Sequence, residues 1–240
     1  MHRSFFRSIR RTAALAALAA IPASAMCAAA PLAHAAAPNI DATAQGEQQV
    51  LSIAQARKLP IGTKVTVRGS VSTPSGAFES SFGDKGFGLQ DGTAGIYVSL
   101  QVNVNTAPND VARVTGVLQD SNGLLIIAPA SPDDVQVHCG GPEVRPQSVK
   151  TAAVNEATEG RIVRVSGTIT KGPTDDAPYG FLFFVNDGSG DIQIFVNVQT
   201  GIALSSLHLG QSVKITGFSS QYSDHYEIDP RGPSDIVTAP

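Results

Sequence analysis

Apolar and polar residues alternate over short stretches along most of the chain, and Gly, Pro, Asp-Gly or Asn-Gly pairs separate these stretches. Alternation with a period of two predicts strands that bury one face, and the turn residues between them predict hairpins. Strands are expected at 63–72, 86–90, 95–101, 110–119 and 124–137 in the first half, and at 161–170, 179–186, 191–198, 211–219 and 226–237 in the second, with a short helix at 201–207.

The second half of the pattern repeats the first. "GTKVTVRGSV" (62–71) matches "GRIVRVSGTI" (160–169), and "ARVTGV" (112–117) matches "VKITGF" (213–218). The turn "QDGTAG" of the first half corresponds to "NDGSGD" of the second. Because the matched blocks keep their order at separations of 96 to 101 residues, we expect two copies of one structural unit.

Five short strands with an insertion between the third and fourth are typical of a small Greek-key barrel, the OB-fold. Gly69 and Gly167 occupy matched positions inside the first strands, where glycine weakens pairing unless the strand must bend. The sequence therefore predicts an all-β chain of two tandem five-stranded OB-fold barrels after a signal peptide. The expected parts are a signal peptide (1–35), a flexible tail (36–50), barrel 1 (51–138), a linker (139–147) and barrel 2 (148–240).

The N-terminus has the features of an export signal. Arginines precede the apolar stretch "TAALAALAAIPASA" (12–25), and Ala-x-Ala sites follow at 23–25 and 33–35. The apolar run is shorter than the roughly 20 residues that a spanning helix needs. We therefore expect a periplasmic or secreted protein that is exported by a Sec-type signal. The Arg10-Arg11 pair leaves the twin-arginine route as an alternative. Cys27 is a weaker match to a lipoprotein site, because Met26 precedes it instead of a small residue.

Charge and cysteine content narrow the choice of partners. Cleavage after Ala35 removes four arginines and leaves 13 Lys and Arg against 20 Asp and Glu, a net charge of −7. Because Lys and Arg provide most non-specific affinity for phosphates, nucleic-acid binding is expected to be weak and salt-sensitive. Cys139 would be the only cysteine, so no internal disulfide is expected.

The candidate chemical motifs point away from catalysis. Asp187, Ser189 and Asp191 could supply oxygens to calcium, but an Asp-Gly hairpin turn explains them, and Gly95 replaces Asp191 in the first copy. The histidines do not have zinc-site spacing, and there is no Gly-x-Ser-x-Gly elbow. "YEIDPRGPSD" (226–235) partly matches staphylococcal-type nucleases, which leaves a degenerate nuclease as a remote alternative. No enzyme activity, metal or cofactor is expected.

The stretches "LSIAQARKLPIGTKVTVRGSVS", "FGLQDGTAGIYV" and "VARVTGV", with their counterparts in the second half, resemble OB-fold repeats of secreted bacterial proteins. Some of those repeats are attached to extracellular nucleases. The resemblance covers nearly the whole chain after the signal and implies the fold. It does not imply nuclease activity, because we expect no catalytic domain in this chain.

An OB-fold binds oligonucleotides or oligosaccharides on the face of strands two and three, between the 1–2 and 4–5 loops. Strand alternation places Phe184 and Phe195 on this face in the second copy, while Ile192 and Ile194 point inward. Aromatic side chains there can stack on bases or on sugar rings. The predicted ligand-binding residues are Tyr97, Phe184, Phe195, Gln193, Asn197, Tyr179, Tyr222, Arg68 and Arg164.

Two functions remain open besides the remote alternative of a degenerate nuclease. The first is an exported, non-enzymatic binding protein for single-stranded nucleic acid or an oligosaccharide. The second is a structural or adaptor protein, because paired outward phenylalanines can also be buried between the barrels, against a protein partner or in self-association.

Overall fold

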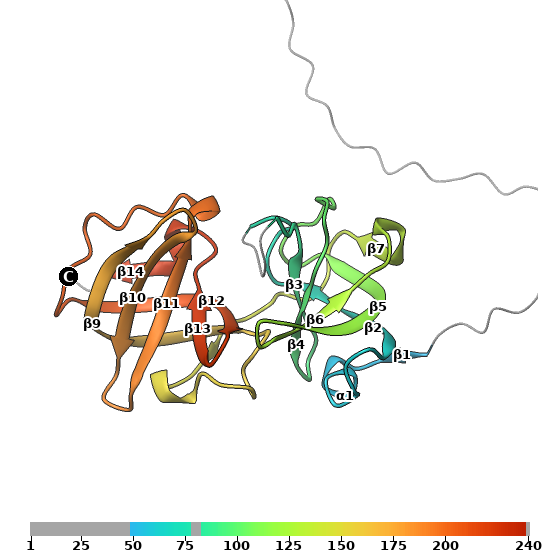
Figure 1. Cartoon of the computed structure of the whole chain (residues 1–240), viewed down its shortest axis with the longest axis horizontal. Helices are drawn as coiled ribbons and strands as arrows, with labels where there is room; N and C mark the ends of the chain where they lie inside the picture. The colour runs from blue at the N-terminus through green and yellow to red at the C-terminus, as the bar shows by residue number, and fades with distance from the viewer. Residues whose placement is uncertain (1–48, 78–82, 239–240) are drawn as a thin grey trace, which may run out of the picture. The chain divides into compact units, whose positions relative to one another are not determined.

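The computed structural model describes residues 49–77 and 83–238. Within these ranges the chain forms fourteen strands in two sheets and one short α-helix, α1 (Ile53–Ala56) (Figure 1). The expected signal peptide, Cys27 and most of the expected tail lie outside the described residues. No helix in the described part is long and apolar enough to cross a membrane.

Each sheet closes on itself with the strand pairing of an OB-fold. In barrel 1 the order is β2-β3-β4-β6-β5, and β5 pairs back onto β2; in barrel 2 it is β9-β10-β11-β13-β12, and β12 pairs back onto β9. The third and fifth strands of each barrel are parallel, and the other pairs are antiparallel. The barrel strands are β2 (Lys64–Val71), β3 (Phe87–Gln90), β4 (Gly95–Val98), β5 (Val111–Ser121) and β6 (Leu124–Ala128), then β9 (Ile162–Asp176), β10 (Gly180–Asn186), β11 (Asp191–Asn197), β12 (Ser212–Tyr222) and β13 (His225–Asp229).

Short elements extend both barrels in the same way. A two-residue strand, β1 (Val50–Leu51) or β8 (Gln147–Ser148), runs parallel to the first barrel strand. A final strand, β7 (Val135–His138) or β14 (Ile236–Thr238), pairs with the fourth. The duplication inferred from the sequence therefore includes the flanks of each barrel.

The matched strand glycines lie where the first strand crosses the second. A Cβ on Gly69 would lie 2.7 Å from the Gln90 carbonyl oxygen, and one on Gly167 would lie 2.5 Å from that of Asn186. No side chain fits at that approach, which confirms the reason for expecting glycine in a strand that serves two neighbours.

Two sequence expectations about elements were wrong. The expected last strand of each copy is interrupted, because Pro129 and Pro230 provide no N–H to a ladder and a 3-10 turn follows at Pro132–Asp134 or Pro233–Asp235. The expected helix at 201–207 does not form. Gly201 adopts a left-handed conformation (φ 62°) and ends the short 3-10 helix Val198–Thr200 instead.

Candidate functional site: the outer face of barrel 2

The face of strands two and three of barrel 1 is covered by barrel 2. Tyr97 on β4 points away from the barrel 1 core as expected, yet its side chain is fully buried. Its ring meets that of Phe218 from β12 edge-on, with 5.9 Å between ring centroids. Leu124 and Ile162 belong to the same apolar cluster.

Tyr97 is therefore not available to a ligand, and its assignment as a binding residue is corrected. Gly88 leaves room on β3 for the Phe218 ring, because a Cβ there would lie 3.0 Å from Phe218 Cε2. Strand alternation identifies the side of the sheet on which a side chain lies, but it cannot identify what covers that side.

Polar contacts hold the two barrels together around this cluster. The Arg57 guanidinium donates to Glu159 (3.1 Å) and Glu156 (2.5 Å) across the junction. Burial raises the pKa of the Glu159 carboxyl, and the nearby Glu156 adds to this, while Arg57 lowers it in part. Further hydrogen bonds join Leu125 N–H to Glu159, Ile162 N–H to Gln90, Arg161 to the Thr93 carbonyl, Arg231 to the Ser72 carbonyl and Ser223 N–H to the Asn122 carbonyl.

The corresponding face of barrel 2 carries partly exposed apolar side chains. We call the outward side chains of Lys171, Leu182, Phe184, Gln193 and Phe195 the open face. Leu182 pairs with Phe195 across β10 and β11, and Phe184 pairs with Gln193, so the two phenylalanines are diagonal neighbours. None of the five belongs to the barrel 2 core or to the buried cluster at the junction. The expected alternation is confirmed here, since Ile192, Ile194, Phe183 and Val185 are buried.

A cation lies at one edge of the open face. Lys171 Nζ is 4.8 Å from the centroid of the Phe184 ring and 3.2 Å from Asp191 Oδ2. Hydrogen bonds from Asn186 and Lys171 lower the pKa of the Asp191 carboxyl. The ammonium group is thus held over an aromatic ring but is partly neutralised by its ion pair.

Hydrogen-bonded polar side chains from β11 and β13 border the open face. Gln193 Nε2 donates to Glu227 Oε2 at 2.8 Å, and the His225 ring nitrogen Nε2 lies 3.2 Å from Gln193 Nε2. Burial raises the pKa of the Glu227 carboxyl, although the hydrogen bond from Gln193 opposes this. His225 and Glu227 were not among the residues predicted from the sequence, although alternation along "HYEID" places both on the outer side.

Asn197 does not lie on the open face with its neighbours. It is 8% exposed, and its side chain accepts a hydrogen bond from Gln199 N–H, capping the 3-10 helix Val198–Thr200. Its prediction as a ligand-binding residue is corrected, because β11 ends here and its alternation ends with it.

The other predicted residues are not among the five side chains of the open face. Tyr179 and Tyr222 are 57% and 53% exposed and lie in the 1–2 loop and at the tip of the β12–β13 hairpin. Arg68 is exposed on barrel 1, directly across from Arg113. Arg164 donates to Thr216 Oγ1 at 3.0 Å and precedes Lys171 by seven residues, about 23 Å along an extended strand. The structure therefore does not bring these two arginines to the open face.

The aspartates of the doubled turns have the same structural role in both copies. Asp91 accepts a hydrogen bond from Ile53 N–H at the start of α1 (2.8 Å), and Asp187 accepts one from Thr151 Oγ1 (2.7 Å). Hydrogen bonds from Ser189 and Thr151 hold the pKa of Asp187 well below its usual range. In the described residues no group of three His, Cys, Asp or Glu is placed to hold a metal ion.

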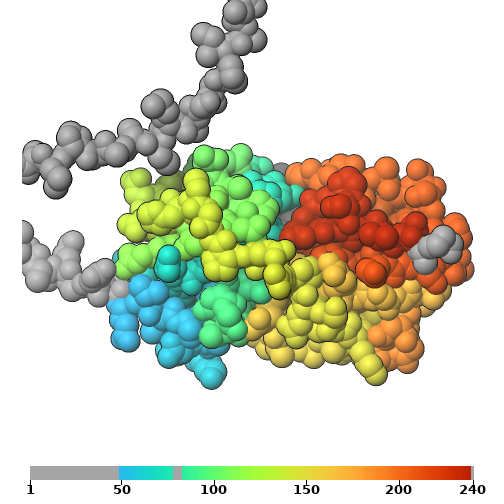
Figure 2. All heavy atoms as spheres, turned by 180° about the vertical axis from the view of Figure 1, so that it is seen from behind, coloured from blue at the N-terminus to red at the C-terminus, as the bar shows by residue number. Residues whose placement is uncertain are grey.

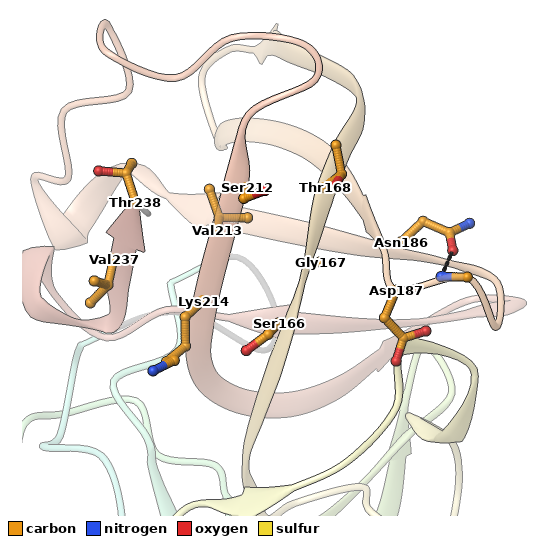
Figure 3. A pocket seen from close by; sticks show the side chains of 11 residues that line it. Ser166, Gly167, Thr168, Asn186, Asp187, Ser212, Val213, Lys214, Val237 and Thr238 are labelled. Atoms are coloured by element: carbon orange, nitrogen blue, oxygen red, sulfur yellow. Dashed lines mark hydrogen bonds between the residues drawn. The ribbon is translucent and has the colours of Figure 1, made fainter. Parts of the chain in front are cut away.

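A groove lies beside this turn in each barrel. The barrel 2 groove has a volume of about 740 Å³ and lies between β9, β12, β14 and the Asp187-Gly188 turn (Figure 3). The barrel 1 groove, of about 440 Å³, is formed by the matching parts of β2 and β5 and the Asp91-Gly92 turn. The turns are predicted from the sequence, but the grooves are not, because they depend on strands that are distant in the chain.

No family model matches the chain, and no curated protein does. Similar solved structures include a murine DNA-binding protein bound with double-stranded DNA, with 13% identity over 73% of this chain and 96% of that one (TM-score 0.39). Fission yeast Pot1 with single-stranded DNA has 12% identity over 81% and 89% (TM-score 0.37). The hypothetical protein ygiW from E. coli has 20% identity over 43% and 100% (TM-score 0.30). At these identities and TM-scores the similarities do not indicate what this chain binds.

Proposed function

We propose that the chain is an exported, non-enzymatic OB-fold binding protein that binds single-stranded nucleic acid on the open face of barrel 2. The observation that carries the proposal is the pair of partly exposed phenylalanines, Phe184 and Phe195, at the position where OB-folds bind oligonucleotides. Bases can stack on such rings whatever their sequence. The resemblance of the sequence to secreted bacterial repeats, some attached to nucleases, supports export and this ligand.

The electrostatics of the open face set the expected strength of binding. Lys171 is paired with Asp191, and Asp175 and Asp176 lie at the end of the same strand, β9. Few phosphates can therefore be neutralised, so stacking must supply most of the affinity. Binding should be weak, and it should fall further as salt is added.

The test is fluorescence anisotropy of a labelled single-stranded oligonucleotide at low and moderate salt. Each base stacked on an aromatic ring contributes about 1–3 kcal/mol, so Phe184→Ala or Phe195→Ala should weaken binding about 5- to 150-fold. Phe181→Ala is a matched control, because Phe181 is 38% exposed on the same strand but its side chain lies on the opposite side of the sheet. Absence of binding at low salt, or equal losses in all three variants, would contradict the proposal.

An oligosaccharide is the second candidate ligand, and the polar group at β13 favours it. Gln193, His225 and Glu227 provide hydrogen-bonding groups beside the aromatic rings, and a neutral sugar is not repelled by the acidic surroundings. Calorimetric titration with neutral oligosaccharides tests this candidate. Heat of binding that is lost in Phe195→Ala, together with no binding of DNA, would select it.

A further inference from the structure

Three outward positions are apolar in barrel 1 and polar in barrel 2. They are occupied by Tyr97, Leu124 and Ile126 in barrel 1 and by Gln193, His225 and Glu227 at the same places on the matching strands of barrel 2. In barrel 1 the three side chains are buried in the cluster at the junction. In barrel 2 they are joined by hydrogen bonds instead, and we call them the polar network.

The amide nitrogen of Gln193 uses both of its hydrogens inside the polar network. It donates one to Glu227 Oε2 at 2.8 Å, and His225 Nε2 lies 3.2 Å from the same nitrogen. His225 Nδ1 lies 3.3 Å from Asp224 Oδ1, so a neutral ring keeps its proton on Nδ1 and accepts at Nε2. Turning the amide over would lose both hydrogen bonds, and its orientation is therefore fixed.

The fixed amide leaves its carbonyl oxygen for a ligand. Gln193 Oε1 accepts no hydrogen bond from any described residue, and it is not one of the buried polar atoms that lack a partner. Gln193 lies directly across from Phe184 and two residues before Phe195, on the same outward side. The open face therefore presents one oriented hydrogen-bond acceptor beside its two aromatic rings.

The linker between the barrels packs on another part of the molecule. Val144 contacts the apolar cluster at the junction, and the linker is the yellow-green chain across the surface seen in Figure 2. Strands β10 and β11 lie on the opposite side, at the front of barrel 2 in Figure 1. A ligand can therefore approach the Gln193 carbonyl from solvent.

An acceptor without a neighbouring donor distinguishes the nucleic-acid bases. Cytosine and adenine carry an exocyclic amino group that donates hydrogen bonds, whereas thymine and uracil carry a carbonyl at the corresponding edge. Phosphate oxygens are acceptors and gain nothing from a second acceptor. The Gln193 carbonyl can thus bond an amino group, and it repels a carbonyl group in the same place.

We propose that Gln193 makes the open face prefer cytosine and adenine over thymine and uracil. This inference rests on the proposed binding of single-stranded nucleic acid and adds a base preference to it. Gln193 contacts the base, while His225 and Glu227 are positioning residues that hold its amide. Stacking on Phe184 and Phe195 supplies most of the affinity for every base, and the hydrogen bond supplies the preference.

The experiment compares oligodeoxycytidine with oligodeoxyuridine of the same length, by fluorescence anisotropy at low salt and about pH 8, where histidine is neutral. In homopolymers every register presents the same base. The wild type should bind the cytosine oligomer about 2- to 12-fold more tightly, which is the range for one hydrogen bond. Gln193→Met keeps the length of the side chain without the acceptor. It should remove the preference and leave the affinity for the uracil oligomer unchanged.

Two further variants test the positioning and the location. Glu227→Leu frees the amide to turn and should reduce the preference, whereas a merely structural role would weaken both oligomers equally. Gln199→Met is the matched control, because Gln199 is an exposed glutamine outside the open face, and it should keep the full preference.

The outcomes separate the base preference from the proposed function. Equal binding of the two oligomers by the wild type, with Phe195→Ala still weakening both, would overturn the preference alone. A preference that persists in Gln193→Met would overturn the role of Gln193. Absence of binding by either oligomer would overturn the proposed function and the preference with it.

Discussion

Glu227 and Asp229 are neighbouring acidic side chains on the outward side of β13, and both are buried. Burial raises the pKa of each carboxyl, and repulsion from Glu227 raises that of Asp229 further. Ser220 gives Asp229 a hydrogen bond, but Asp229 Oδ1 has no hydrogen-bond partner among the residues that the structure describes. Other charged groups acting on Glu227 are His225, which lowers its pKa, and Asp176, which raises it.

These raised pKa values predict how stability depends on pH. A carboxyl whose pKa is higher in the folded than in the unfolded state favours folding while it is protonated, and this contribution is lost as pH rises through the folded pKa. The carboxyls with lowered pKa, such as Asp187 and Asp191, are ionised in both states above about pH 5 and add no slope there. As the pH rises from 5 through the folded-state pKa values of Glu227 and Asp229, the free energy of unfolding should therefore fall.

Asp229→Asn should remove much of that slope, which reaches about 1.4 kcal/mol per pH unit for one proton. Asparagine keeps an oxygen that can accept the Ser220 hydrogen bond and carries no charge. Urea unfolding of both proteins between pH 5 and 8.5 measures the effect. A variant that follows the wild-type curve over the whole range would show that Asp229 does not carry this dependence.

At the scale of elements, two glycines allow the β3–β4 hairpin of barrel 1 to contact barrel 2. A Cβ on Gly95 would lie 1.9 Å from the Gly160 carbonyl oxygen, and one on Gly160 would lie 2.3 Å from the carbonyl carbon of Gly95. This contact explains why Gly95 stands in barrel 1 where barrel 2 has Asp191. It is a packing requirement of the junction.

Gly95→Ala should destabilise the protein by about 2 kcal/mol or more, because the obstructing atoms are backbone and cannot move aside. Gly92→Ala lies in the same hairpin with no atom within 4 Å of the added Cβ and serves as the control. Thermal unfolding of the two variants separates the effects, since 1 kcal/mol shifts the Tm of a chain of this size by about 2–4 °C. A similar Tm for both would mean that the glycine contact is not required.

Strand alternation predicted the elements well because it depends only on neighbours in the chain. It placed Phe183 and Val185 inside barrel 2 and Phe184 outside. It also placed Tyr97 correctly outside its own barrel, but the covering ring of Phe218 is 121 residues away in the sequence. Whether a face is free or covered depends on such distant contacts, and periodicity contains no information about them.

At the scale of the whole molecule, the Arg57–Glu159 pair joins the barrels through a fully buried carboxylate. Arg57→Ala would leave this carboxylate without its cation, which costs about 3–5 kcal/mol when a buried pair is broken. Denaturant unfolding measures the loss. Adding Glu159→Gln to Arg57→Ala should recover part of the lost stability. If neither change has a measurable effect on the free energy of unfolding, the ion pair is unimportant for stability.

Coverage of the barrel 1 face also predicts how many ligands one chain binds. Among the described residues the barrel 1 face is covered and the barrel 2 face is open, so an oligonucleotide or oligosaccharide short enough for one barrel should saturate at one per chain. Calorimetry gives this number directly. Two equivalent sites per chain would mean that the junction opens and that the barrel 1 face becomes accessible.

The contact between Phe218 and Gly88 joins two different surfaces of related barrels, and such a head-to-tail contact can in principle continue from molecule to molecule into a filament. Here the sequence prevents continuation at both ends. Barrel 2 has Phe184 where barrel 1 has Gly88, so it offers no hollow to another ring, and barrel 1 has Val117 where barrel 2 has Phe218. We therefore expect assembly through this surface to stop at a single pair of barrels within one chain.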